Sequence, residues 1–152
     1  MPTSRKPNTV ARPAIGWREW VRLPELDIDR IQAKVDTGAR TSALHAVRVR
    51  TERIDGIDVV HFDVHPLQRS PRPLVRCRLP LVDERYVRSS DGERELRPVV
   101  ETAVQLYDET WTIELTLTNR ALMGFRLLLG RQALRRKFVV DPSRSWIRSQ
   151  RK

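Results

Sequence analysis

The chain has 152 residues, of which 39% are hydrophobic and 32% are charged, and its formal net charge at pH 7 is +10. This length predicts one domain with a substantial core, and the apolar segments are far shorter than the roughly 20 residues that span a bilayer. The single cysteine, Cys77, excludes an internal disulfide and fits a reducing compartment. We therefore expect a cytoplasmic protein that does not cross a membrane.

The positive charge is concentrated at the two ends of the chain. Residues 1–22 carry a net charge of +4 and residues 131–152 carry +7, whereas residues 23–130 carry −1. Basic ends of this kind could contact a ribosome or RNA, whose phosphates attract them. A solvated basic surface explains the same charges equally well.

The distribution of prolines and of apolar residues predicts that the chain divides into three segments. Residues 1–13 contain three prolines and no hydrophobic periodicity, which predicts a flexible basic arm. Residues 14–145 hold the strand patterns and are predicted to form the domain. Residues 146–152 are predicted to be a basic tail.

Much of the domain alternates between polar and apolar residues with a period of two, which is typical of half-buried strands. Asp55-Gly56 separates two such segments and predicts a tight hairpin turn. Residues 131–136 are expected to start one short C-terminal helix. The pattern as a whole predicts a mainly β fold, a closed or nearly closed barrel. The expected strands span residues 15–23, 31–35, 47–53, 59–64, 74–81, 84–88, 93–100, 102–107, 111–117, 125–130 and 137–140.

A hairpin that differs from the others is predicted over residues 82–100. Its tip consists of Ser89, Ser90, Asp91 and Gly92. Because a polar tip that contains glycine has few apolar contacts to hold it, we expect this tip to be mobile.

One predicted strand runs into a chemically distinctive turn, Asp36-Thr37-Gly38. Gly38 permits a tight turn or a close backbone approach that a side chain would forbid. A carboxylate at the end of a buried strand is costly unless it is hydrogen-bonded or used. Thr37 and the amides of Gly38 and Ala39 are the nearest groups able to hold it. The tripeptide by itself favours a simpler interpretation, in which Asp36 caps a turn or a short helix over residues 41–44.

The candidate metal ligands are His45, His61, His65 and Cys77. No H-E-x-x-H motif is present, and His61 and His65 lie four residues apart on a predicted strand. At roughly 3.3 Å per residue their side chains would be about 13 Å apart, which is too far for one metal ion. We therefore expect surface or hydrogen-bonded histidines and no metal site. No phosphate-binding G-x-x-x-x-G-K-[ST] loop is present either, so no cofactor is expected.

The order of two elements resembles the retropepsin-like aspartic proteases. An apolar strand runs into the Asp36 turn, and about ninety residues later a second apolar strand ends at Leu129-Gly130, with a flap-like hairpin between them. Several blocks between Ile15 and Ser145 are also similar to a bacterial family whose members carry the name ATP-dependent zinc protease. These blocks are AKVDTGARTSALHA, VHPLQR, LTNRALMGFRLLLGRQAL and VDPSRS.

This resemblance implies a retropepsin-like closed β-barrel with a flap hairpin and an aspartic-type endopeptidase activity. In retropepsin-like proteases the Asp-Thr/Ser-Gly turn carries the catalytic acid, which assigns catalytic roles to Asp36, Thr37 and Gly38. An apolar-apolar-Gly element braces that turn from below, and Leu129 and Gly130 are its counterparts in this chain.

The resemblance also implies a homodimer. Hydrolysis by carboxylates needs two of them close together, one ionised to take a proton from water and one protonated to donate to the carbonyl oxygen. The chain contains a single Asp-Thr-Gly sequence. A twofold dimer that brings Asp36 of two copies together would complete the pair.

For the substrate, the resemblance implies contacts with the flap tip and with the residues after the turn. The flap tip would close over the substrate, next to Ala39 and Arg40, and Arg40 could face an acidic side chain. A solvated turn residue or an internal ion pair explains Arg40 as well. The family is linked to an ATP-dependent ligase that adds glutamates to a ribosomal protein, which implies an acidic substrate. The alternative function is a non-catalytic basic β-barrel module that binds ribosome or RNA through its ends.

Overall fold

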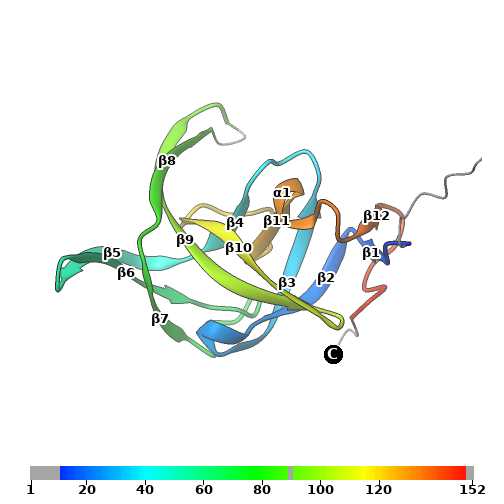
Figure 1. Cartoon of the computed structure of the whole chain (residues 1–152), viewed down its shortest axis with the longest axis horizontal. Helices are drawn as coiled ribbons and strands as arrows, with labels where there is room; N and C mark the ends of the chain where they lie inside the picture. The colour runs from blue at the N-terminus through cyan, green and yellow to red at the C-terminus, as the bar shows by residue number, and fades with distance from the viewer. Residues whose placement is uncertain (1–10, 89–90, 150–152) are drawn as a thin grey trace, which may run out of the picture.

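The computed structural model describes residues 11–88 and 91–149 (Figure 1). The mainly β fold predicted from the sequence is confirmed, with one short α-helix near the C-terminal end. The elements, in chain order, are β1 (Ala14–Gly16), β2 (Arg18–Leu23), the 3-10 helix η1 (Pro24–Leu26), β3 (Ile28–Asp36), β4 (Ser42–His45), β5 (Val47–Ile54), β6 (Ile57–Val64), β7 (Val75–Pro80), β8 (Asp83–Arg88), β9 (Arg94–Leu106), β10 (Glu109–Thr118), β11 (Leu127–Gly130), α1 (Arg131–Leu134) and β12 (Val139–Asp141).

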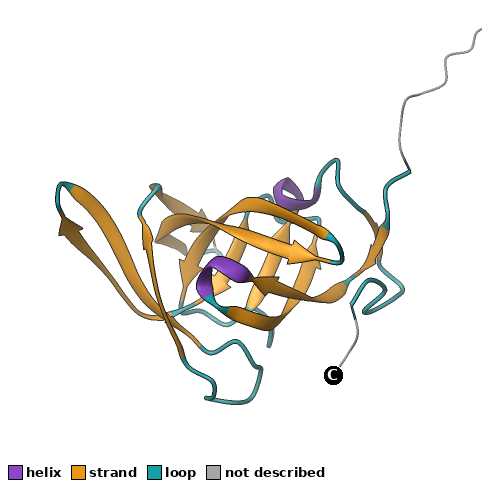
Figure 2. Cartoon of the chain, turned by 60° about the horizontal axis from the view of Figure 1, so that its bottom comes forward, coloured by secondary structure: helices purple, strands orange, loops and turns teal. Residues whose placement is uncertain are grey.

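Six strands close into a barrel (Figure 2). The strand order is β10-β4-β11-β3-β2-β9, and an antiparallel pairing of β9 with β10 joins the last strand to the first. Two neighbouring pairs are parallel, β3 with β11 and β4 with β10. Because the barrel is closed, these strands have no free edges.

The barrel interior is filled by branched aliphatic side chains from every wall. Leu23, Ile31, Leu115, Leu127 and Leu129 are all fully buried in this cluster. They alternate along their strands with residues that face outward, as the period of two predicts. Each such side chain contributes roughly 1.5–3 kcal/mol to the free energy of unfolding, so the barrel is a rigid platform for the loops at its ends.

Two hairpins extend beyond the barrel. The flap hairpin, formed by β8 and the first half of β9, projects from the barrel and curves over it (Figure 1). The other hairpin joins β5 to β6, which pairs in turn with β7. Its turn at Asp55-Gly56 has positive φ at both residues, the geometry that a two-residue hairpin turn requires.

Three local predictions from the sequence are wrong. The simpler interpretation let Asp36 cap either a turn or a short helix at residues 41–44. The turn is present, but the helix is not: β4 is a strand there and pairs with both β10 and β11. The predicted strands 93–100 and 102–107 are one continuous strand, β9. The predicted strand 15–23 is interrupted at Trp17, so that β1 can pair with β12 instead of continuing the barrel.

The C-terminal segment is held against the start of the domain by a buried carboxylate. Glu19 is fully buried. It accepts hydrogen bonds from the backbone N–H of Gly16 at 2.7 Å, Ile147 at 2.9 Å and Arg148 at 3.2 Å, and from the Ser149 hydroxyl at 2.6 Å. Residues 146–149 of the predicted tail therefore pack on the domain. Residues 1–10 of the predicted arm and residues 150–152 of the tail lie outside the described residues.

No helix in residues 11–88 and 91–149 is long and apolar enough to cross a membrane.

Candidate active site

Asp36 is the last residue of β3 and begins a tight turn. Its side chain is half-buried, and its Oδ1 accepts a hydrogen bond from the Gly38 N–H at 3.0 Å. The Ala39 N–H donates to the backbone carbonyl of Asp36 at 3.1 Å. The carboxylate therefore holds the turn that presents it, while Thr37 and Gly38 are exposed. Within the described residues, the Thr37 hydroxyl makes no hydrogen bond.

Gly130 lies beside Asp36 in the parallel register of β3 and β11. Its N–H donates to the Ser42 hydroxyl oxygen at 3.0 Å, in a buried position. A Cβ at Gly130 would come within 2.6 Å of the Thr41 carbonyl oxygen, so only glycine fits. Leu129, fully buried, anchors the same strand in the barrel core.

The residue after Gly130 also supports the turn. The Arg131 N–H donates to the Ala39 carbonyl at 2.8 Å. Its guanidinium Nη1 donates to the carbonyls of Thr37 at 3.4 Å and Gly38 at 3.2 Å. The backbone of the Asp36 turn is thus held on one side by its own carboxylate and on the other by the start of α1. The sequence pattern by itself does not indicate this role for Arg131.

A cleft of about 960 Å³ separates the Asp36 turn from the flap hairpin. Asp36, Ala39 and Arg40 line one side of it. The β8 arm lines another side, together with Asp91 from the flap tip. Gly92 has the positive φ of a turn glycine and is not among the lining residues. Ser89 and Ser90, the other tip residues named from the sequence, lie outside the described residues.

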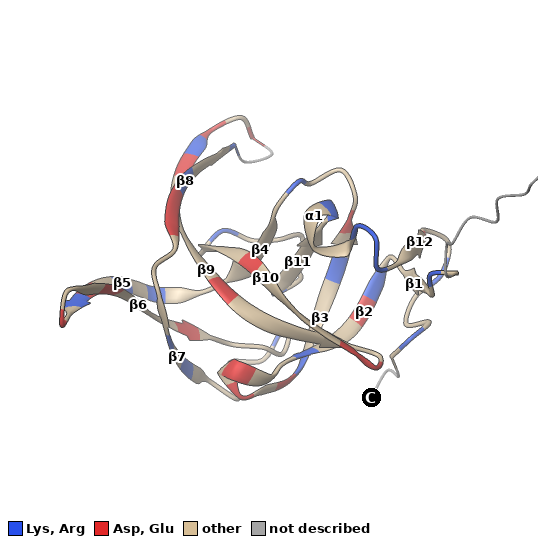
Figure 3. Cartoon of the chain, viewed as in Figure 1, with Lys and Arg blue, Asp and Glu red and all other residues tan. Residues whose placement is uncertain are grey.

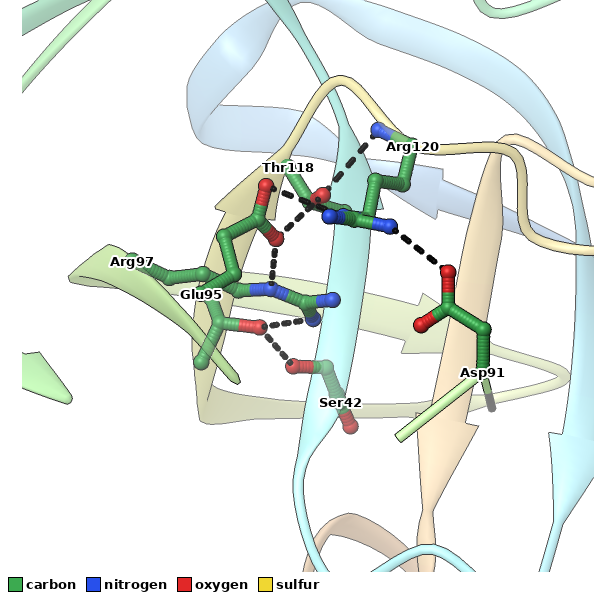
Figure 4. A network of polar contacts seen from close by, with 7 residues as sticks. Ser42, Asp91, Glu95, Arg97, Thr118 and Arg120 are labelled. Carbon is green, nitrogen blue, oxygen red and sulfur yellow. Dashed lines mark hydrogen bonds and ion pairs between the residues drawn. The ribbon is translucent and has the colours of Figure 1, made fainter. Parts of the chain in front are cut away.

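Beneath the flap hairpin, polar side chains form one network (Figure 4). Glu95 accepts hydrogen bonds from Arg97 Nε at 2.6 Å and from the Thr118 hydroxyl at 2.9 Å. Arg120 bridges two carboxylates, with 3.5 Å from its Nε to Glu95 and 3.5 Å from its Nη1 to Asp91. The flap tip is therefore tied to the floor of the cleft through Asp91.

The charges in this network are balanced by direct contact. Burial acts to raise the pKa of Glu95, but the hydrogen bonds from Arg97 and Thr118 and the charges of Arg97 and Arg120 outweigh it, and the pKa lies below its usual range. Glu95 is therefore ionised at neutral pH. Arg97, whose side chain is only 8% exposed, is neutralised by it.

The network extends to the residues that support the Asp36 turn. Arg97 Nη1 donates to the Thr116 hydroxyl at 3.4 Å, and that hydroxyl donates to the Ser42 carbonyl at 3.2 Å. The Ser42 side chain in turn accepts the Gly130 N–H. One chain of polar contacts thus runs from the flap tip to the glycine beside Asp36.

This network is not predicted by the sequence pattern. Thr116 and Thr118 alternate with core leucines on β10, so the pattern predicts a solvent-facing side for them. Both are in fact buried, because the flap hairpin covers that face. One available signal was Arg97, an arginine directly before the apolar run Pro98-Val99-Val100.

Two arginines of the cleft remain without a carboxylate. Arg40 and Arg88 are exposed, and neither is ion-paired within residues 11–88 and 91–149. By contrast, Arg85 pairs with Asp83 and Glu114 at 2.8 Å each. Acidic and basic residues alternate along the flap hairpin (Figure 3). The unpaired cations lie on opposite sides of the cleft, next to the Asp36 turn and at the end of β8.

The candidate metal ligands are dispersed. His61 bonds to Glu52 at 2.8 Å, and His65 bonds to the Pro71 carbonyl at 2.8 Å. His45 does not line the Asp36 cleft. Burial, with a smaller contribution from Asp63, raises the pKa of the Cys77 thiol to about 12. Within the described part of the chain, no three His, Cys, Asp or Glu residues are grouped to hold a metal ion.

A closed β-barrel with an Asp-Thr-Gly turn, a glycine brace and an overhanging hairpin defines the retropepsin-like class. The model of the RimB-like family, described as the retropepsin-like aspartic endopeptidase RimB, matches residues 14–151. The chain belongs to this family, which confirms the resemblance recognised in the sequence.

Relatives with a curated name are longer than this chain. A protein of Desulfotalea psychrophila is 46% identical over 134 residues, which cover 88% of this chain and 29% of the relative. A protein of Shewanella pealeana is 47% identical over 132 residues, with coverages of 87% and 29%. Both are named probable alpha-L-glutamate ligase. The chain thus spans less than a third of the length of these relatives.

A solved structure shares the fold. The crystal structure of a Legionella pneumophila protein of unknown function superimposes with a TM-score of 0.73 at 29% sequence identity. The match covers 90% of this chain and 98% of the Legionella protein. The shared fold therefore extends over nearly all of that solved chain.

Proposed function

We propose that this chain is an aspartic peptidase that works as a homodimer and cleaves acidic peptides. The observation that carries the proposal is the placement of Asp36. A half-buried carboxylate ends a barrel strand, is held by a glycine-braced turn, and opens into a cleft beneath a hairpin. Such a rigid setting is what a catalytic carboxylate needs, because small displacements cost much of the rate.

The count of available carboxylates supports the homodimer. Asp36 is the only carboxylate on the braced turn. The other two acids that line the cleft are each paired with an arginine, Asp91 with Arg120 and Glu114 with Arg85. A second Asp36 from a partner copy would supply the missing group without disturbing those pairs.

In the dimer, the two carboxylates would share one proton. The ionised Asp36 takes a proton from a water molecule, whose oxygen attacks the scissile carbonyl carbon, while the partner's Asp36 donates its proton to the carbonyl oxygen. The tetrahedral intermediate then collapses, the C–N bond breaks, and the amine leaves with a proton from the dyad. The flap hairpin would exclude bulk water during these steps.

The acidic substrate is supported by two observations. Arg40 and Arg88 lie in the cleft without carboxylate partners among the described residues, so each could pair with an acidic side chain of the substrate. Relatives whose name is glutamate ligase also contain a region similar to this chain. A ligase that adds glutamates and a peptidase that removes them would act on the same tails, as the family link to a ribosomal protein implies.

Mass spectrometry of a peptide with a C-terminal glutamate tail, incubated with wild type and with Asp36→Asn, tests the proposal. We expect the wild type to remove glutamates and Asp36→Asn to lose activity by a factor of about a thousand or more, since one essential acid-base group is gone. Asp55→Asn, in the β5–β6 hairpin turn, is the matched control and should cleave like the wild type.

The dimer is tested separately by sedimentation equilibrium. A second test mixes the wild type with an excess of Asp36→Asn. The cleavage activity per wild-type subunit should fall, because a mixed dimer has a single carboxylate at position 36. Cleavage by Asp36→Asn at the wild-type rate would refute the catalytic assignment. Activity that scales linearly with the wild-type fraction in the mixture would refute the shared site.

A further inference from the structure

A second groove lies next to the Asp36 cleft. Its volume is about 1070 Å³, and its walls come from β2, β3, residues 67–70 and the loop between β10 and β11. Residues 121–123 of that loop line both this groove and the Asp36 cleft, so the two are neighbours across one strip of chain. We call it the Trp–Arg groove, after Trp17, Arg18, Trp20, Arg30, Arg69, Arg126 and Trp146, which line it.

The charge of this groove is of one sign. Four arginines line it, and none of its lining residues among those described is aspartate or glutamate. The Asp36 cleft, by contrast, contains three acidic residues. A concave surface whose charged lining residues are all cationic concentrates anions.

Arg18 is held in place but has no ion pair among the described residues. Its guanidinium carbon lies 4.6 Å from the centre of the Trp17 ring and 4.0 Å from the centre of the Trp146 ring. Its Nε donates to the Ser145 hydroxyl at 3.1 Å. Stacking between two rings fixes the plane of the guanidinium, and a fixed plane suits bidentate binding of a carboxylate.

Two further donors of the groove lack acceptors. The buried Trp20 Nε1 and Arg126 Nε have no hydrogen-bond partner within the described residues. A buried donor without a partner is destabilising. An acceptor brought by a ligand would reduce this destabilisation once either side chain turns toward it.

We propose that the Trp–Arg groove binds a stretch of acidic polypeptide that continues from the substrate in the Asp36 cleft. The inference rests on the proposed function and extends it: the protein would hold a long acidic tail at two places. Residues 121–123 provide the continuity between them. A stacked base of RNA is the poorer occupant, because Arg18 already covers Trp17 and Trp146, and Arg30 lies 4.1 Å over Trp20.

The test compares binding of two fluorescent oligoglutamate peptides to Asp36→Asn, which keeps the peptides intact. A peptide of about four glutamates extends roughly 13 Å and fills the cleft alone, whereas one of about fifteen extends roughly 50 Å and reaches the groove. The groove variant is Arg18→Gln with Arg69→Gln. The control is Arg76→Gln with Arg78→Gln, which removes the same charge from exposed positions on β7.

We expect the groove variant to bind the long peptide about tenfold more weakly at low salt and to bind the short peptide unchanged. The control should bind both like its parent. Arg69→Gln alone, at an exposed position, should show part of the loss without any effect on folding.

Three outcomes would overturn the proposal. The first is equal affinity of the groove variant and its parent for the long peptide. The second is an equal loss in the control variant. The third is a single-stranded oligoribonucleotide of matched length that binds through the groove while the long peptide does not. Because binding is measured without cleavage, these outcomes are distinguishable from failure of the catalytic proposal.

Discussion

A Cβ on Gly130 would lie 2.6 Å from the carbonyl oxygen of Thr41 and 2.9 Å from that of Ala39. Both contacts are with backbone atoms, which cannot move aside as a flexible side chain can. The chain that carries Asp36 and the strand that supports it are therefore packed as closely as a backbone allows. Any side chain at position 130 has to displace the Asp36 turn.

Gly130→Ala should lower the free energy of unfolding by about 1–3 kcal/mol, because overpacking forces the backbone to shift. Cleavage should fall further than stability predicts, since the shift occurs beside Asp36. Urea unfolding and peptide cleavage at a temperature where the variant is folded measure the two effects. Val139→Ala, at an exposed strand position, is the control and should change stability by less than about 0.5 kcal/mol. Unchanged cleavage in Gly130→Ala would show that the brace is dispensable.

Arg120→Gln should loosen the flap hairpin, because Arg120 joins the tip residue Asp91 to Glu95. Its ion pairs are partly exposed, so the free energy of unfolding should fall by no more than about 1 kcal/mol. The ratio kcat/KM should fall severalfold through a higher KM. Arg53→Gln breaks an exposed ion pair with Asp58 on the β5–β6 hairpin and is the matched control. Equal kinetic effects of the two variants would contradict a role for the flap contact.

Glu19→Gln should release the C-terminal segment. The buried carboxylate accepts from three backbone N–H groups and one hydroxyl, and an amide would direct its own N–H₂ at some of these donors. We expect a loss of roughly 2–4 kcal/mol in the free energy of unfolding and faster tryptic cleavage after Arg148. Glu84→Gln, exposed on β8, should change neither. Wild-type resistance to trypsin in Glu19→Gln would refute this anchoring.

His45 should make stability depend on pH. Burial, and next the charge of Arg126, lower the pKa of His45 below its usual value of 6.5. The unfolded chain therefore binds the proton more readily than the folded chain, and the free energy of unfolding falls as the pH drops below about 6.5. Urea unfolding from pH 5 to 8 measures this slope. His45→Gln should flatten it, and an unchanged slope in that variant would assign the pH dependence to other groups.

Much of the local structure could be predicted from the sequence. The alternation of polar and apolar residues predicted most strands, and Asp55-Gly56 predicted a hairpin turn. The apolar strand before Asp36 indicated the chemically distinctive turn. These features depend on neighbours in the chain, whose spacing is written directly in the sequence. The family resemblance added the pairing of that turn with Leu129-Gly130.

Contacts between distant segments could not be predicted in the same way. The short segment that contains Ser42 could form a helix or a strand, and pairing with β10 and β11 decided for strand. Thr116 has the sequence pattern of a solvent-facing residue, and only the flap hairpin above it makes it part of a buried network.

The sequence by itself determined the mainly β class, the chemically distinctive Asp36 turn and the excess of positive charge, since each depends on residue type and short-range spacing. Only the tertiary structure decided which arginines are neutralised. Arg97 forms an ion pair with Glu95 on the same strand, whereas Arg18 lies against the rings of Trp17 and the distant Trp146. Arg40 and Arg88 pair with no carboxylate among the described residues. The contact with Trp146 depends on the fold, because the buried Glu19 carboxylate holds the C-terminal segment against β2.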